Sequence, residues 1–176
     1  MPFIILTIVV AAVVGVLIAA SLRSATFRIA RSLRVRAPAD RIFPLINDFH
    51  QWAQWSPFEK LDPAMQKTFG GPPTGRGSTY AWSGNNRAGQ GRMEITESMP
   101  YSRVAIDLEF ERPWKARNLA IFTLEPTGDA TTVTWAMEGR HVFMGKVMGL
   151  FMNLDKMVGK DFEAGLVNLG TLSERR

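Results

Sequence analysis

The chain has 176 residues, 46% of them apolar, with no cysteine and two histidines. This length fits one domain with a real core, and the lack of cysteine excludes disulfides, thiolate nucleophiles and the usual structural zinc sites. The formal charge is +5, and five arginines within the first 36 residues account for all of it, because 16 of the 21 basic residues remain beyond them against 16 acidic ones. The rest of the chain is therefore neutral and lacks the clustered lysines and arginines that bind the phosphates of a nucleic acid, so no nucleic-acid partner is expected.

The segment from 2 to 22 contains no charged residue. At about 1.5 Å per residue, a helix of this length matches a hydrocarbon core of roughly 30 Å. We therefore predict a transmembrane helix over 2–22 and a basic linker over 23–28. Because the arginines follow the span, the positive-inside rule places the domain on the cytoplasmic side of the cell membrane, in a single-pass topology. A cleaved signal peptide remains the alternative, since Ala19, Ala20 and Ser21 are small residues near a cleavage point.

The domain itself is predicted over residues 29–176. It begins with a strand, because apolar and basic residues alternate from Arg28 to Arg36. A short helix opens at Pro38 and is followed by aromatic-rich helical turns. The segment from 69 to 77 is rich in glycine and proline, and we predict a turn there, since no Gly-Lys-Ser/Thr phosphate loop follows it.

Strands and turns then make up most of the remaining chain. Alternating apolar segments separated by Gly, Asn or Pro indicate an antiparallel meander. The predicted strands span residues 78–83, 89–98, 102–110, 116–125 and 130–139. A helix is predicted from 143 to 172, where apolar residues recur every three or four positions. Its apolar stripe should pack on the dry face of the sheet.

Several short motifs resemble one known family. The segment APADRIFPLINDFHQWAQWSPF at 37–58 contains Trp52 and Trp55, which match the W-x-x-W of that family's first helices. The motifs TYAWSGN at 79–85, TTVTW at 131–135 and FEAGL at 162–166 are similar in the same way. Together with the order of the elements, they resemble the START-like superfamily, also called SRPBCC, in its polyketide cyclase/dehydrase and lipid-transport branch.

This resemblance implies an α+β helix-grip fold of the Bet v 1/START-like kind. A curved antiparallel sheet then wraps around a long C-terminal helix, and the cavity between them holds a lipid, a polyketide or another apolar molecule. The N-terminal span departs from the pattern, because many soluble relatives lack it. Fold alone does not settle function.

The strand parities and the resemblance together predict a set of ligand-binding residues, largely the inward-facing apolar side chains that line small-molecule pockets. The set is Trp52, Trp55, Tyr80, Trp82, Met93, Ile95, Ile106, Leu108, Phe110, Phe122, Leu124, Trp135, Met137, Phe151 and Leu154. For any single residue a core position is the simpler interpretation. The whole set favours a cavity, because five tryptophans and nine methionines are costly to close-pack without a gap.

Catalytic residues are harder to find, because catalysis needs an acid, a base or a nucleophile with a neighbour that tunes it. Solvated positions are expected for Asp107, Glu109 and Glu138. His141 and Tyr80 are the only candidates for an acid or base in the cavity, and His50 fits a helix start better than a catalyst. Two isolated histidines do not make a ligand set, so neither a metal nor another cofactor is predicted.

Three functions remain open. The first is a membrane-anchored binding or carrier protein for a hydrophobic small molecule or lipid, with the membrane as a second partner. The alternative is a cyclase- or dehydratase-like enzyme that uses the same cavity. The third is a protein-interaction domain whose core is fully packed.

Overall fold

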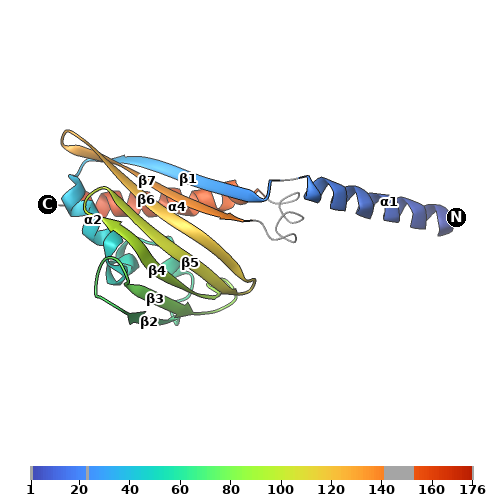
Figure 1. Cartoon of the computed structure of the whole chain (residues 1–176), viewed down its shortest axis with the longest axis horizontal. Helices are drawn as coiled ribbons and strands as arrows, with labels where there is room; N and C mark the ends of the chain where they lie inside the picture. Colours follow the sequence, from blue (N-terminus) through green and yellow to red (C-terminus); the bar gives the residue numbers. More distant parts are fainter. Residues whose placement is uncertain (1, 23, 141–152, 176) are drawn as a thin grey trace.

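The structure is a computed structural model that describes residues 2–22, 24–140 and 153–175. In these parts, strands form one antiparallel sheet in the order β1-β7-β6-β5-β4-β3-β2, and α4 packs against it (Figure 1). The strands are β1 (Thr26–Val35), β2 (Gln66–Gly70), β3 (Thr79–Ser83), β4 (Gln90–Met99), β5 (Arg103–Arg112), β6 (Ala116–Thr127) and β7 (Ala130–Arg140). The helices are α1 (Pro2–Ser21), α2 (Ala39–Asn47), η1 (Phe49–Gln54), η2 (Pro57–Lys60) and α4 (Leu154–Glu174).

The N-terminal segment corrects one prediction. α1 extends away from the sheet (Figure 1). A helix needs about 20 consecutive apolar residues to cross a bilayer. Within the described ranges of the chain, no helix is long and apolar enough to do so. The predicted transmembrane helix over 2–22 and the location on the cytoplasmic side of the cell membrane are therefore wrong.

The α+β sheet and C-terminal helix confirm the predicted helix-grip architecture. Each predicted strand is present with small shifts at its ends. One strand was missed: β2 lies within 66–70, partly in the segment expected to be a turn, and all of its residues are exposed. Such an edge strand has no alternation of buried and exposed positions for a sequence pattern to detect. α4 begins at Leu154, and the part of the predicted helix from 143 to 152 lies outside the described residues.

The W-x-x-W motif has a structural role at the end of α2. The last carbonyls of a helix have no partner within it and need donors from elsewhere. Trp52 Nε1 donates to the carbonyl of Ile46 at 3.0 Å, and Trp55 Nε1 donates to the carbonyl of Leu45 at 2.9 Å. Both indoles are buried, so they fill the core and also satisfy the helix end.

α4 lies close to the sheet because glycines face it. A side chain at Gly165 would place a Cβ 2.7 Å from Cζ3 of Trp135, and one at Gly159 would place it 2.0 Å from Nη2 of Arg31. The ring of Phe162 stacks on Trp135, with centroids 4.2 Å apart and planes at 9°. Glycines in the first half and middle of α4 therefore let the helix lie close to Arg31 on β1 and to Trp135 on β7.

Candidate functional site

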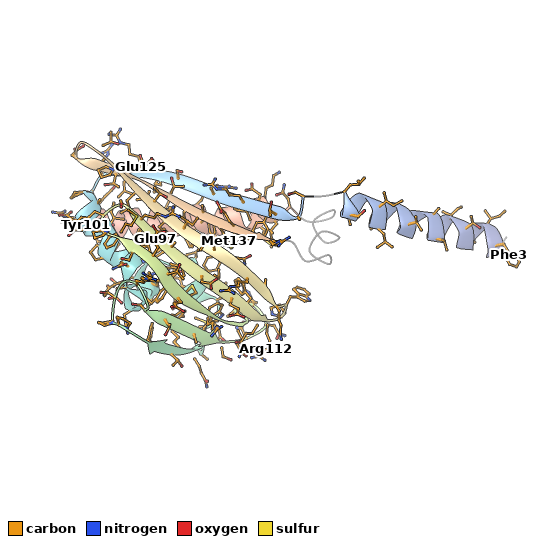
Figure 2. All side chains as sticks on the ribbon, viewed as in Figure 1. Phe3, Glu97, Tyr101, Arg112, Glu125 and Met137 are labelled. Carbon is orange, nitrogen blue, oxygen red and sulfur yellow. The ribbon has the colours of Figure 1, made fainter. Side chains whose placement is uncertain are left out.

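The inner face of the sheet, which α4 covers in part, can be divided into four rows by the strand register. The Trp135 row contains Arg31, Trp135, Phe122 and Val104, and the Met137 row contains Ile29, Met137, Ala120, Ile106 and Ile95. The Asn118 row contains Phe27, Gly139, Asn118, Leu108, Met93 and Tyr80, and the Phe110 row contains Ala116, Phe110, Gly91 and Trp82. In Figure 2, Arg112 marks the end of β5 beside the Phe110 row, and Tyr101 lies at the opposite end of the sheet.

The Trp135 row is a packed core. Trp135 is 3% exposed and lies within aromatic contact distance of Trp55, at 5.6 Å, and of Phe122, at 4.9 Å. Trp52 joins the same cluster, 4.9 Å from Trp55. Four of the predicted ligand-binding residues thus pack against one another. For these four, the simpler interpretation as core positions fits the contacts. Their role in ligand binding stays a prediction.

Burial decreases toward the other end of the face. The Met137 row is still buried, but Leu108, Phe110 and Trp82 in the last two rows are only half-buried. Phe27, which sequence reasoning did not single out, is half-buried in the Asn118 row. In the two outermost rows, half-buried apolar side chains thus lie beside the buried Met93, Tyr80 and Asn118, and this part of the inner face is partly accessible.

Most of the remaining predicted contacts also lie on the inner side. Tyr80, Met93, Ile95, Ile106, Leu124 and Met137 are buried, and Leu154 at the start of α4 is half-buried. Phe151 lies outside the described residues. The parity of the predicted strands thus placed these side chains on the correct face.

Arg31 explains where α4 is held on the sheet. Although basic, it lies on the inner face, where its guanidinium donates to the Asp155 carboxylate at 3.0 and 3.1 Å and to Glu163 at 2.7 Å. It also donates to the carbonyls of Ala30 and Asp155. The hydrogen bonds from Arg31 hold the pKa of Asp155 below its ordinary value. Phe27 lies four residues before Arg31, so the Asn118 row is about 13 Å farther along β1 than this clamp.

Tyr80 is part of a polar group at the edge of the inner face. Its hydroxyl donates to Oε1 of Glu59 at 2.7 Å, and Lys67 Nζ forms an ion pair with Oε2 of the same carboxylate, which is 8% exposed. Burial and the bond to Glu59 raise the pKa of Tyr80. A phenol that keeps its proton and donates it in a hydrogen bond to a carboxylate is a poor base at neutral pH.

The structure describes one of the two histidines. His141 lies outside the described residues. His50 lies in η1, where Nδ1 contacts Oδ1 of Asp48 at 2.8 Å and the ring stacks on Phe69. Burial alone would raise the pKa of Asp48, but hydrogen bonds from His50 and Gln51 outweigh it and lower that pKa. Within residues 2–22, 24–140 and 153–175, no three His, Cys, Asp or Glu side chains cluster to hold a metal.

Two hollows can be described on the domain. The larger, of about 610 Å³, is lined mainly by residues of the outer face, among them Arg28, Asp107, Leu119 and Glu138, and it also reaches Phe27, Asn118 and Gly139 of the Asn118 row. The smaller, of about 260 Å³, lies between η1 and β2 beside His50. Neither coincides with the predicted cavity under α4.

Comparison with known proteins agrees with this architecture. The family model described as polyketide cyclase / dehydrase and lipid transport matches residues 26–174. No curated protein is significantly similar to the chain in sequence. A Thermobifida fusca protein solved by NMR is 21% identical with a TM-score of 0.63, covering 84% of this chain and 91% of its own.

Two further structures have the same fold. The protein CV1439 from Chromobacterium violaceum is 15% identical with a TM-score of 0.60, covering 86% of this chain and 99% of its own. DynU16, described as a putative protein in the dynemicin biosynthetic locus, is 16% identical with a TM-score of 0.57, covering 82% of this chain and 46% of its own. The resemblance to START-like proteins is confirmed, and the chain belongs to the polyketide cyclase/dehydrase and lipid transport family.

Proposed function

We propose that this domain binds a hydrophobic small molecule or lipid on the inner face of the sheet, at the Asn118 and Phe110 rows, and acts as a binding or carrier protein. The observation that carries the proposal is the change along one continuous apolar face, from fully buried at Trp135 to half-buried at Leu108 and Phe110. Small molecules bind at apolar, partly accessible surfaces, because binding removes the apolar area of both the ligand and the protein from water, which is favourable.

The family supports the same proposal at a coarser level, because its description includes lipid transport. A shared fold hosts several functions, so this support is associative. The packed Trp135 row favours binding near the strand ends over binding deep under α4. Membrane anchoring forms no part of the proposal.

An enzyme that uses the same surface is the second candidate. The observation in its favour is the buried carboxylate of Glu59, which contacts both Tyr80 and Lys67 beside the Asn118 row. Against an enzyme, the two oxygens of this carboxylate already contact the Tyr80 hydroxyl and the Lys67 ammonium group, so no proton donor or acceptor is left free there. A carrier therefore agrees better with the described contacts than proton transfer does.

A matched pair of substitutions tests where the ligand binds. Leu108 lies in the Asn118 row, and Leu119 lies on the neighbouring strand, one residue past the partner of Leu108, on the opposite face. Binding of the apolar dye N-phenyl-1-naphthylamine to the full chain is measured by fluorescence. Leu108→Arg should weaken binding about tenfold or more, because an unpaired charge then replaces an apolar contact. Leu119→Arg should leave the affinity unchanged.

The reverse pattern would place the ligand in the outer hollow, which Leu119 lines. If the wild-type chain does not bind the dye at all, the interaction-domain hypothesis with a closed core gains and the proposal fails. Leu108→Trp, which fills the space without adding charge, controls for misfolding. It should also block the dye, with a thermal midpoint near that of the wild type.

A further inference from the structure

The larger hollow lies where β1 begins and β7 ends, side by side at one end of the sheet (Figure 1). Its volume of about 610 Å³ falls within the usual range of small-molecule pockets, roughly 300–1,000 Å³. Most of its lining belongs to the outer face, so a ligand on the inner face does not account for the charges found there. The charged side chains that line it are Arg28, Asp107, Arg117, Glu138 and Arg140.

Two ion pairs use four of these side chains. Arg28 pairs with Glu138 at 3.0 Å, and Arg117 pairs with Asp107 and lowers the pKa of that carboxyl. Arg28 donates to Glu138 through Nε alone, and Arg117 donates to Asp107 through Nε and Nη2. Because a guanidinium has five N–H groups, both arginines keep donors that no described residue accepts from.

Arg140 is the unbalanced charge of the hollow. It is exposed and forms no ion pair with any residue that the structure describes. The adjoining segment from 141 to 152 contains no Asp or Glu. Glu109, which lies opposite Arg117 in the register, is already paired with Arg92. The lining therefore has three arginines against two carboxylates, a net charge of +1.

The strand register places two of these arginines at facing ends of neighbouring strands. Asn118 pairs with Gly139, and the next positions toward this end of the sheet are Arg117 on β6 and Arg140 on β7. Like charges at opposite positions destabilise a sheet, and an anion bound beside them would remove that cost. The planar guanidinium group fits the paired oxygens of a carboxylate or a phosphate.

We infer that this hollow is a second binding site and takes a small organic anion, whose carboxylate or phosphate group is bound by Arg140 and by the free donors of Arg28 and Arg117. The apolar part of the anion contacts Leu119 and Phe27, two half-buried side chains that also line the hollow. The inference does not depend on the proposed function, because it rests on charged groups of the outer face.

The test is isothermal titration calorimetry of the full chain at neutral pH with phenyl phosphate, benzoate and the uncharged benzyl alcohol. At least one of the two anions should bind with a Kd below about 1 mM, and benzyl alcohol should bind at least about tenfold more weakly. The affinity for the anion should fall as sodium chloride is added, because salt screens exposed charges. The anion that binds more tightly identifies which oxyanion the site prefers.

Charge substitutions with opposite expected effects test the residues. Arg140→Gln should weaken the anion about fivefold, whereas Glu138→Gln, which removes the partner of Arg28, should strengthen it by about the same factor. A misfolded variant would not bind more tightly, so the gain controls for folding. Arg34→Gln is the matched control, because Arg34 is also exposed and without an ion pair to any described residue, but lies outside the hollow. It changes the net charge equally and should leave the affinity unchanged.

Three results would overturn the inference. The first is that the wild-type chain binds neither anion. The second is that Arg34→Gln weakens binding as much as Arg140→Gln does, which would show a general effect of net charge. The third is that Glu138→Gln fails to strengthen binding. Dye binding and the substitutions at Leu108 test the inner face separately, so either proposal can fail while the other holds.

Discussion

Replacing Phe162 with alanine tests whether the space between α4 and the Trp135 row is solid core. Phe162 is 2% exposed and stacks on Trp135 at 4.2 Å. Removing a buried phenylalanine costs about 3–5 kcal/mol, which includes the contribution of the aromatic pair, against a total stability of about 5–15 kcal/mol for a domain. The thermal midpoint should fall by roughly 6–20 °C, at about 2–4 °C per kcal/mol for a chain of this size.

Urea unfolding followed by circular dichroism and by tryptophan fluorescence gives the free energy of unfolding. Val167→Ala is the matched control, because Val167 is on the same helix and 54% exposed, so the free energy should change by less than about 0.5 kcal/mol. A loss below about 1 kcal/mol for Phe162→Ala would refute the packed-core interpretation. The space beside Trp135 would then be available to a ligand, and binding deep under α4 would be favoured over binding at the Asn118 row.

Two further outcomes concern ionisable groups. The hydrogen bond from Arg31 lowers the pKa of Asp155 in the folded chain. This bond therefore stabilises the fold fully above the ordinary carboxyl pKa near 3.9, and the stabilisation is lost as the pH falls through the lowered pKa. Arg31→Met should therefore reduce the decrease in the urea midpoint between pH 6 and pH 3, and an unchanged profile would contradict the clamp. The pKa of Tyr80 is raised by burial and by Glu59, so stability should fall as the pH rises above about 10, where the unfolded tyrosine ionises first. Absorbance at 295 nm should show no ionisation of Tyr80 in the folded chain up to about pH 11, with Tyr80→Phe identifying the signal that appears only on unfolding.

The inner face could be predicted from the sequence to a large extent. Side chains in a strand alternate between the two faces, so the apolar positions around Ile106 and Leu108 identify one face without knowledge of the partner strands. The W-x-x-W motif likewise indicated buried tryptophans. Its bonds to the end of α2 were not predicted, because a pattern of residue types does not show which carbonyls lack a partner.

Arg31 and Asn118 show the limit of that approach. Both have the parity of the inner face, Arg31 with Ile29 and Leu33, and Asn118 with Ala120 and Phe122. That parity is a signal that could have identified them. In the sequence, Arg31 was counted only among the five arginines that follow the apolar N-terminal segment, and Asn118 was not considered, since neither residue fits a pattern of apolar positions.

The sequence alone determined the fold class and the face of each long strand, because these depend on periods of two and of about 3.6 residues that act locally. Its short motifs indicated the family. The exposed edge strand β2 was missed, because it has no such period. Only the tertiary structure decided which part of that face is packed and which is accessible. It brought Glu59 to Tyr80, and Asp155 and Glu163 to Arg31, across long separations in the chain. Such contacts between distant segments depend on strand register and on where α4 begins, which a local pattern of residue types does not encode.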